Sequence, residues 1–167
     1  AIAADPAIKS HKKHAAVLAE LKQALAHGSD EVRRRFEEEG DSGAEVARGL
    51  SFLMDQLIRV IHDHAAAHEF PSGVPTTAES LAIVAVGGYG RAELSPYSDI
   101  DLLFLLPYKA TPYSERMVEY ILYMLWDLGL KVGHATRSVD ECLRQAKADL
   151  TIRTAMLEAR WLWGDQK

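Results

Sequence analysis

The sequence predicts an α/β protein, α+β in its details, built as a small mixed β-sheet with flanking helices and preceded by a helical N-terminal segment. Three observations predict this class. Apolar residues recur at helical spacing over residues 1–70, a stretch rich in proline, glycine and small polar residues follows, and short apolar runs then alternate with helical patterns. We therefore expect a helical segment over 1–70, a linker over 71–80 and a sheet-containing core over 81–167.

The N-terminal segment divides into three predicted helices, over residues 6–27, 29–39 and about 42–68. Leucines at helical spacing mark the first helix, and Gly28 is expected to end it. Ser42 begins a Ser-x-x-Glu sequence, the spacing of a capping box, at the start of the third helix.

The core alternates between short strands and helices. Continuous apolar runs predict buried strands, while Thr111 and Pro112 have the order of an N-cap followed by a first-turn proline. The predicted strands are 81–86, 99–106 and 130–137. The predicted helices are 111–128, 138–148 and 149–164.

Composition excludes several classes of protein. The 167 residues carry a formal net charge of −5, so a broad DNA- or RNA-binding face is not expected. No apolar run approaches the roughly 18 residues of a membrane span, and no signal peptide is recognisable. Cys142 is the only cysteine and cannot form an internal disulfide. We expect a cytoplasmic protein and, since the sequence begins without methionine, a piece of a longer chain.

Two aspartates open the predicted strand 99–106. Alternate residues of a strand project to the same face, so Asp99 and Asp101 point together while Ile100 points into the core. Two adjacent carboxylates repel each other unless a cation lies between them. Mg²⁺ prefers oxygen ligands and commonly takes one or two carboxylates plus substrate phosphates. The pattern therefore predicts a Mg²⁺ site at Asp99 and Asp101.

Glycines follow the preceding strand directly. Gly87 and Gly88 allow the backbone to turn sharply and a ligand to approach it closely. Arg91 supplies a fixed positive charge suited to phosphate, and the hydroxyl of Ser98 could donate to a phosphate oxygen. A glycine turn beside metal-binding carboxylates predicts a site for a nucleoside triphosphate. The spacing fits neither a Walker A loop nor a Rossmann fingerprint.

The stretch GGYGRAELSPYSDIDLL resembles the nucleotidyltransferases of the DNA polymerase β type, and more closely the bacterial PII uridylyltransferase family. WDLGLKVGHATRSVDECL, over 126–143, extends the resemblance. It implies transfer of UMP from UTP to a tyrosine of the PII nitrogen-regulatory protein, with release of pyrophosphate. It also implies Mg²⁺ at Asp99 and Asp101 and the triphosphate at Gly87 and Gly88.

Two departures from the family pattern stand out. Superfamily members commonly carry a third carboxylate on a later strand, and 130–137 contains none. His134 lies on that strand and Asp127 just before it, and the sequence leaves open which of them, if either, takes the role. Full-length family members also carry HD phosphohydrolase and glutamine-sensing ACT domains. The core over 81–167 is therefore expected to be truncated and to lack uridylyl removal and glutamine sensing.

Three questions stay open at the level of sequence. Arg137 either reaches the nucleotide or forms a surface salt bridge, and no residue that selects the base is recognisable. The chain could be another nucleotidyltransferase of the superfamily, with a different nucleotide or acceptor. It could also be a catalytically silent nucleotide-sensing module, an alternative that the missing carboxylate favours.

Overall fold

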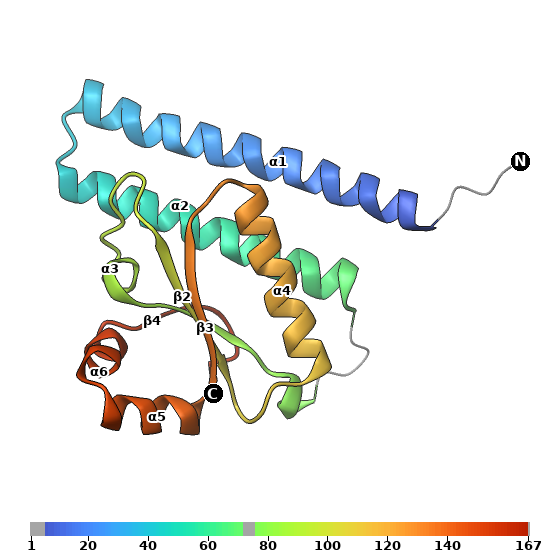
Figure 1. Ribbon diagram of the computed structural model, residues 1–167. Helices are drawn as coiled ribbons and strands as arrows, with labels where there is room; N and C mark the ends of the chain where they lie inside the picture. Colours follow the sequence, from blue (N-terminus) through green and yellow to red (C-terminus); the bar gives the residue numbers. More distant parts are fainter. Residues whose placement is uncertain (1–5, 72–75, 167) are drawn as a thin grey trace, which may run out of the picture.

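The structure is a computed structural model that describes residues 6–71 and 76–166 (Figure 1). Two long helices, α1 (Pro6–Arg34) and α2 (Gly43–His64), lie side by side and connect through a π-helical turn over Arg35–Glu39. The capping box predicted at Ser42 is present, since its hydroxyl accepts from the Glu45 N–H. A second π-helical turn, Ala65–Glu69, extends α2, and the predicted linker includes residues 72–75, which lie outside the described residues.

The sheet has four strands in the order β3-β2-β1-β4. β1 (Ala82–Ala85) pairs antiparallel with both β2 (Ile100–Leu106) and β4 (Arg160–Gly164), and β2 pairs parallel with β3 (Val132–Ser138). Parallel neighbours need a crossover, which is supplied here by helix α4 (Pro112–Asp127). The prediction of a mixed sheet with flanking helices is confirmed.

The prediction that Gly28 ends the first helix is wrong. Helix α1 continues through Gly28, and the glycine serves the packing of the two long helices. A Cβ at this position would lie 2.5 Å from Leu53 Cδ1 of α2. Because Gly28 has no side chain, α1 and α2 can approach closely. The local sequence alone does not distinguish a glycine that allows close packing from a glycine that ends a helix.

The prediction of one helix over 149–164 is also wrong. Helices α5 (Val139–Ala148) and α6 (Leu150–Leu157) follow β3, and the chain then forms β4 at the edge of the sheet. Asp149 caps α6, because its side chain accepts from the N–H groups of Thr151 and Ile152. The end of the segment becomes a strand because β1 offers it a free edge, a tertiary effect that overrides local helix preference.

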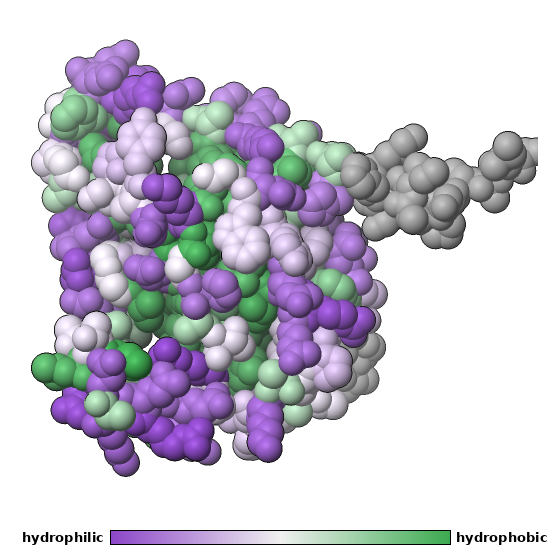
Figure 2. All heavy atoms as spheres, viewed as in Figure 1, coloured by the Kyte–Doolittle hydropathy of each residue, from purple (hydrophilic) through white to green (hydrophobic). Residues whose placement is uncertain are grey.

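Helices cover both faces of the sheet. Buried residues of α2 and α4 share one core with Ile100, Leu102 and Phe104 of β2. On the opposite face Leu103 packs with Val84 and Cys142 under α5 and α6. Alternate residues of β2 thus enter two different cores, as a strand buried on both faces requires. On the side seen in Figure 2, hydrophilic residues surround a central band of hydrophobic ones. No helix in the described ranges has the length and apolar character to cross a membrane.

Candidate nucleotide and metal site

Asp101 is the second residue of β2. Its neighbours Ile100 and Leu102 are fully buried on one face, while the Asp101 carboxylate projects to the other face and is exposed. Partial burial, and then the negative charge of Asp99, raise the pKa of Asp101. Asp99 directly precedes β2, and the effect of its negative charge on Asp101 is one that a bound cation would relieve.

The glycine turn lies directly against this carboxylate. It forms a single helical turn, α3 (Gly87–Gly90), that follows β1, and Gly87 has a φ of +61°. A Cβ on Gly87 would lie 3.3 Å from Oδ2 of Asp101. The backbone conformation favours glycine at this position, and the close carboxylate leaves little space for a side chain. The structure thus brings the predicted phosphate turn and the predicted metal ligand together.

A second glycine faces the same carboxylate from the other side. Gly133 of β3 is the register partner of Asp101 in the parallel pair, and its missing side chain leaves space for Oδ1. A Cβ built on Gly133 would collide with that oxygen. Sequence reasoning did not single out Gly133, although a glycine inside a strand is a recognised sign of close approach.

The glycine turn is fastened to the rest of the fold by an ion pair. Asp55 of α2 accepts two hydrogen bonds from the Arg160 guanidinium of β4, at 2.6 and 3.1 Å, and a third, at 2.7 Å, from the Tyr89 hydroxyl. Arg160 also donates to the backbone oxygens of Tyr89 and Gly90, at 3.2 and 3.3 Å. Two elements, α2 and β4, therefore fix the turn, and no sequence motif indicated Asp55 or Arg160.

Arg91 and Ser98 lie near the site but are engaged with protein groups. Arg91 forms ion pairs with Glu93 and Glu158, at 2.9 and 2.8 Å, which raise the pKa of its guanidinium. A Cβ on Gly88 would lie 3.7 Å from Nη2 of Arg91, so the cation stands beside the turn. The Ser98 hydroxyl donates to the Ser95 oxygen at 2.8 Å in an exposed turn. Their roles toward phosphate stay predictions.

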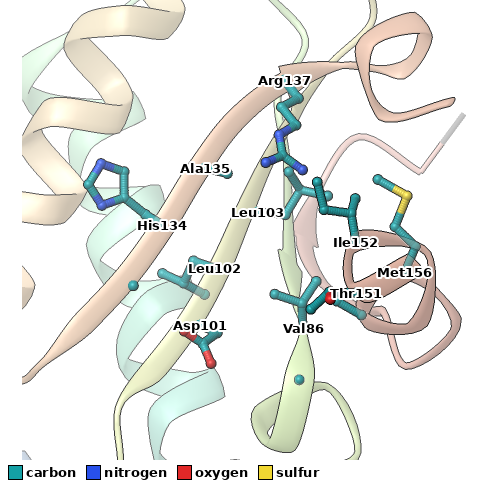
Figure 3. A pocket seen from close by; sticks show the side chains of 13 residues that line it. Val86, Asp101, Leu102, Leu103, His134, Ala135, Arg137, Thr151, Ile152 and Met156 are labelled. Carbon is teal, nitrogen blue, oxygen red and sulfur yellow. The ribbon is translucent and has the colours of Figure 1, made fainter. Parts of the chain in front are cut away.

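A cavity of about 290 Å³ opens beside Asp101, between the sheet and α6 (Figure 3). Its floor consists of backbone and small or apolar side chains of the strands, including Leu103 and Ala135, and α6 contributes Ile152 and Met156. Arg137 points into the cavity at the end opposite Asp101. The cavity thus has a carboxylate at one end, an arginine at the other and an apolar middle.

Neither candidate for the third carboxylate role lies on the face of Asp101. The register partner of His134 is Leu102, whose side chain enters the opposite core, and the His134 ring points away from the cavity (Figure 3). It contacts the Trp126 ring edge-on, with centroids 6.0 Å apart. Asp127 pairs with His14 of α1 at 3.3 Å. The β3 position that does face Asp101 is occupied by Gly133.

The donor set fits a hard divalent cation that brings other ligands with it. The described residues contain no group of three or more His, Cys, Asp or Glu side chains that could hold a metal ion. Asp99 and Asp101 offer carboxylate oxygens only, so the rest of a Mg²⁺ shell would come from water and substrate phosphates, which is the usual arrangement for this ion.

Comparison with known proteins gives two results. Residues 41–121 match the family described as glutamate-ammonia ligase adenylyltransferase (GlnE). Over 157 residues, 94% of the chain, the sequence is 60% identical to the bifunctional uridylyltransferase/uridylyl-removing enzyme of Rhodospirillum rubrum. The enzymes of the same name from Azospirillum brasilense and Novosphingobium aromaticivorans are 58% and 50% identical over 93% and 99% of the chain. The chain spans 17–18% of the length of these relatives.

Proposed function

Because the chain belongs, as a GlnE-type nucleotidyltransferase domain, to the family of these bifunctional enzymes, we propose that it transfers UMP from UTP to a tyrosine of the PII nitrogen-regulatory protein in the cytoplasm. The observation that carries the proposal is the contact between the glycine turn and the carboxylate. Gly87 has a positive φ, and the place that a side chain would take at this position lies next to Oδ2 of Asp101. A triphosphate on the turn would therefore lie beside the metal ligands.

The chemistry is a displacement at phosphorus. The tyrosine oxygen of the acceptor forms a bond to the α-phosphorus of UTP, the bond from that phosphorus to the bridging oxygen breaks, and pyrophosphate leaves with the electron pair. The hydroxyl proton goes to solvent, to which Asp99 and Asp101 are exposed. One or two Mg²⁺ ions, when bound, supply positive charge that activates the attacking oxygen and neutralises the leaving group.

The residues of the chain position these reactants. Asp99 and Asp101 would hold the cation, while the backbone at Gly87 and Gly88 and the side chains of Arg91 and Ser98 would orient the triphosphate. When a triphosphate binds, the Arg91 guanidinium would give up its ion pair with Glu93 or Glu158 and pair with phosphate oxygens instead. One anionic partner would thus replace another. Most of the rate enhancement would come from positioning and charge neutralisation, as in phosphoryl transfer generally.

The test compares Asp101→Ala with Asp140→Ala, an exposed first-turn residue of α5. We expect Asp101→Ala to abolish Mg²⁺-dependent incorporation of labelled UMP into PII and Mg²⁺-dependent UTP binding in calorimetry, with an unchanged circular dichroism spectrum. Asp140→Ala should behave as the wild type. Near-wild-type transfer by Asp101→Ala would contradict the site assignment, and incorporation of AMP in preference to UMP would identify a different nucleotidyltransferase.

A second candidate function is nucleotide sensing without catalysis. The observation that favours it is that Gly133, the residue of β3 that faces Asp101, offers no third carboxylate. Calorimetry and turnover separate the two functions. UTP binding with Mg²⁺ but no transfer to any tested acceptor, including PII, would select the sensing module.

A further inference from the structure

Arg137 is a cation of the cavity described above that is not engaged in a hydrogen bond or an ion pair within the described residues. Its guanidinium forms no hydrogen bond and no ion pair within the described residues, unlike the neighbouring Arg91 and Arg160. The positive charge of Arg137 contributes to lowering the pKa of Glu141, but the two side chains form no ion pair within the described residues, and Oε2 of Glu141 accepts from the Ser138 N–H at 2.8 Å and the Ser138 hydroxyl at 3.1 Å. Arg137 is half-buried, so its donors are held toward the cavity and remain available to a ligand.

The strand register places Arg137 at a defined distance from the metal ligands. Gly133 and Arg137 lie on the same face of β3, two pleats apart, and Gly133 is the partner of Asp101. Four residues of strand span about 13 Å. That interval leaves room for a metal-bound α-phosphate and a ribose before the nucleotide reaches Arg137, so the arginine lies at the depth of the base.

The walls between these two ends suit the flat faces of a base. Leu103 is buried in the floor, and Ile152 and Met156 of α6 form the opposite side. Small-molecule sites combine such apolar walls with a few placed polar groups that fix orientation. Within this cavity Arg137 is the charged group at the base end.

We propose that Arg137 selects the base of the nucleotide by donating hydrogen bonds to a keto oxygen, and so favours uracil over cytosine. The proposal rests on the proposed function, since it assumes a triphosphate anchored at Asp101. A guanidinium only donates. The 4-position of uracil carries an oxygen that accepts, whereas cytosine presents an amino group there, so a cytosine in the same pose would place donors against Arg137.

The test measures Mg²⁺-dependent binding of UTP, CTP and inorganic tripolyphosphate by calorimetry in the wild type, Arg137→Gln and Arg137→Lys. An amide both donates and accepts, so Arg137→Gln should erase discrimination. We expect the wild type to bind UTP at least about tenfold more tightly than CTP. In Arg137→Gln the ratio should fall to near one through weaker UTP binding, with tripolyphosphate affinity unchanged. Arg137→Lys should be intermediate, because it keeps the charge without the planar fork.

The control is Arg144→Gln on α5, whose side chain is 75% exposed and lies outside the cavity. It should leave all three affinities unchanged. An equal loss of UTP, CTP and tripolyphosphate binding in Arg137→Gln would show that Arg137 holds phosphate, and an unchanged UTP/CTP ratio would show that it does not face the base. Either result overturns the proposal. Tripolyphosphate binding that survives Asp101→Asn would instead contradict the proposed function and leave the UTP/CTP comparison as a separate result.

Discussion

Asp101 and Gly133 are register partners on parallel strands, and the absence of a side chain on Gly133 gives the Asp101 carboxylate its position. Gly87 makes space for the second oxygen of the same carboxylate. The orientation of the proposed metal ligand is therefore set by two glycines from different elements, in addition to the rotamer of the aspartate itself.

The first prediction concerns Gly133→Ala. The new methyl group would collide with Oδ1 and displace the carboxylate, so Mg²⁺-dependent UTP binding should weaken at least about tenfold, the order of loss expected when a site ligand is misplaced. Calorimetry measures this directly. Gly43→Ala, at a position with no atom within 4 Å of a new Cβ, is the matched control and should retain wild-type affinity.

The second prediction concerns the pH dependence of stability. Because the pKa of Asp101 is raised in the folded protein, folded molecules bind the proton more tightly than unfolded ones. Above its raised pKa the ionised Asp101 carboxylate therefore lowers the free energy of unfolding. This loss of stability disappears as the pH falls through the raised pKa and the carboxylate becomes protonated. Asp101→Asn should raise the melting temperature at pH 7 without Mg²⁺, within about 2 °C because the side chain is exposed and screened by water.

The same comparison has two internal checks. The advantage of Asp101→Asn should vanish in melts at a pH below the ordinary aspartate pKa, about 3.9. Mg²⁺ with UTP should then stabilise the wild type more than the variant, because ligands that bind only the folded state raise its apparent stability. A variant that melts below the wild type at pH 7 would contradict the account of the repelling pair.

The third prediction concerns the ion pair between Asp55 and Arg160. The two side chains are 21% and 31% exposed, and removing one partner leaves the other half-buried without its counter-charge. Asp55→Asn should reduce the free energy of unfolding by about 2–3 kcal/mol, less than for a fully buried pair. Urea denaturation gives the value, and a double-mutant cycle with Arg160→Gln should show coupling of about 1 kcal/mol or more.

A surface pair serves as the comparison for that cycle. Arg34 and Glu31 form a 2.9 Å ion pair between side chains that are 42% and 43% exposed. Their coupling energy should be clearly smaller than that of Asp55 and Arg160, because water screens an exposed pair. Equal coupling energies in the two cycles would contradict the prediction, because the Asp55–Arg160 pair would then stabilise the fold no more than an exposed pair on a helix does.

The fourth prediction concerns Gly90→Ala. A Cβ here would collide with the backbone oxygen of Glu158 and lie 3.1 Å from the Ala85 oxygen, and backbone atoms of two segments cannot both move away cheaply. The free energy of unfolding should fall by about 1–3 kcal/mol, as in overpacked cores. UTP affinity should fall as well, since Gly90 belongs to the turn that contains Gly87. A Gly90→Ala variant that is as stable as the wild type but binds UTP weakly would separate the effect on stability from the effect on affinity. So would a variant that is destabilised but keeps wild-type UTP affinity.

Local signals in the sequence predicted local structure well. The capping box at Ser42 and the proline start of α4 depend on residues within one helical turn, and each is present. Continuous apolar runs located β1 and β2 for the same reason, and the strand predicted over 130–137 is present as β3. The alternation of Ile100 and Asp101 across a strand follows from strand geometry alone.

Features that depend on distant partners could not be predicted in this way. Gly28 has the local signature of a helix end, and only the position of Leu53 reveals its packing role. Strand β4 depends on the free edge of β1. Asp55 and Arg160 are ordinary charged residues until the fold brings them together, and the orientation of His134 follows from register with β2 rather than from its own neighbours.

The separation of Asp55 and Arg160 by 105 positions has a consequence for synthesis. A ribosome adds about 5–20 residues per second, so several seconds pass after α2 emerges before the last strand can follow. Throughout that delay the glycine turn can bond to Asp55 through Tyr89 but lacks every contact from Arg160. Nascent chains should therefore acquire nucleotide affinity abruptly, at the length that first frees Arg160 from the exit tunnel.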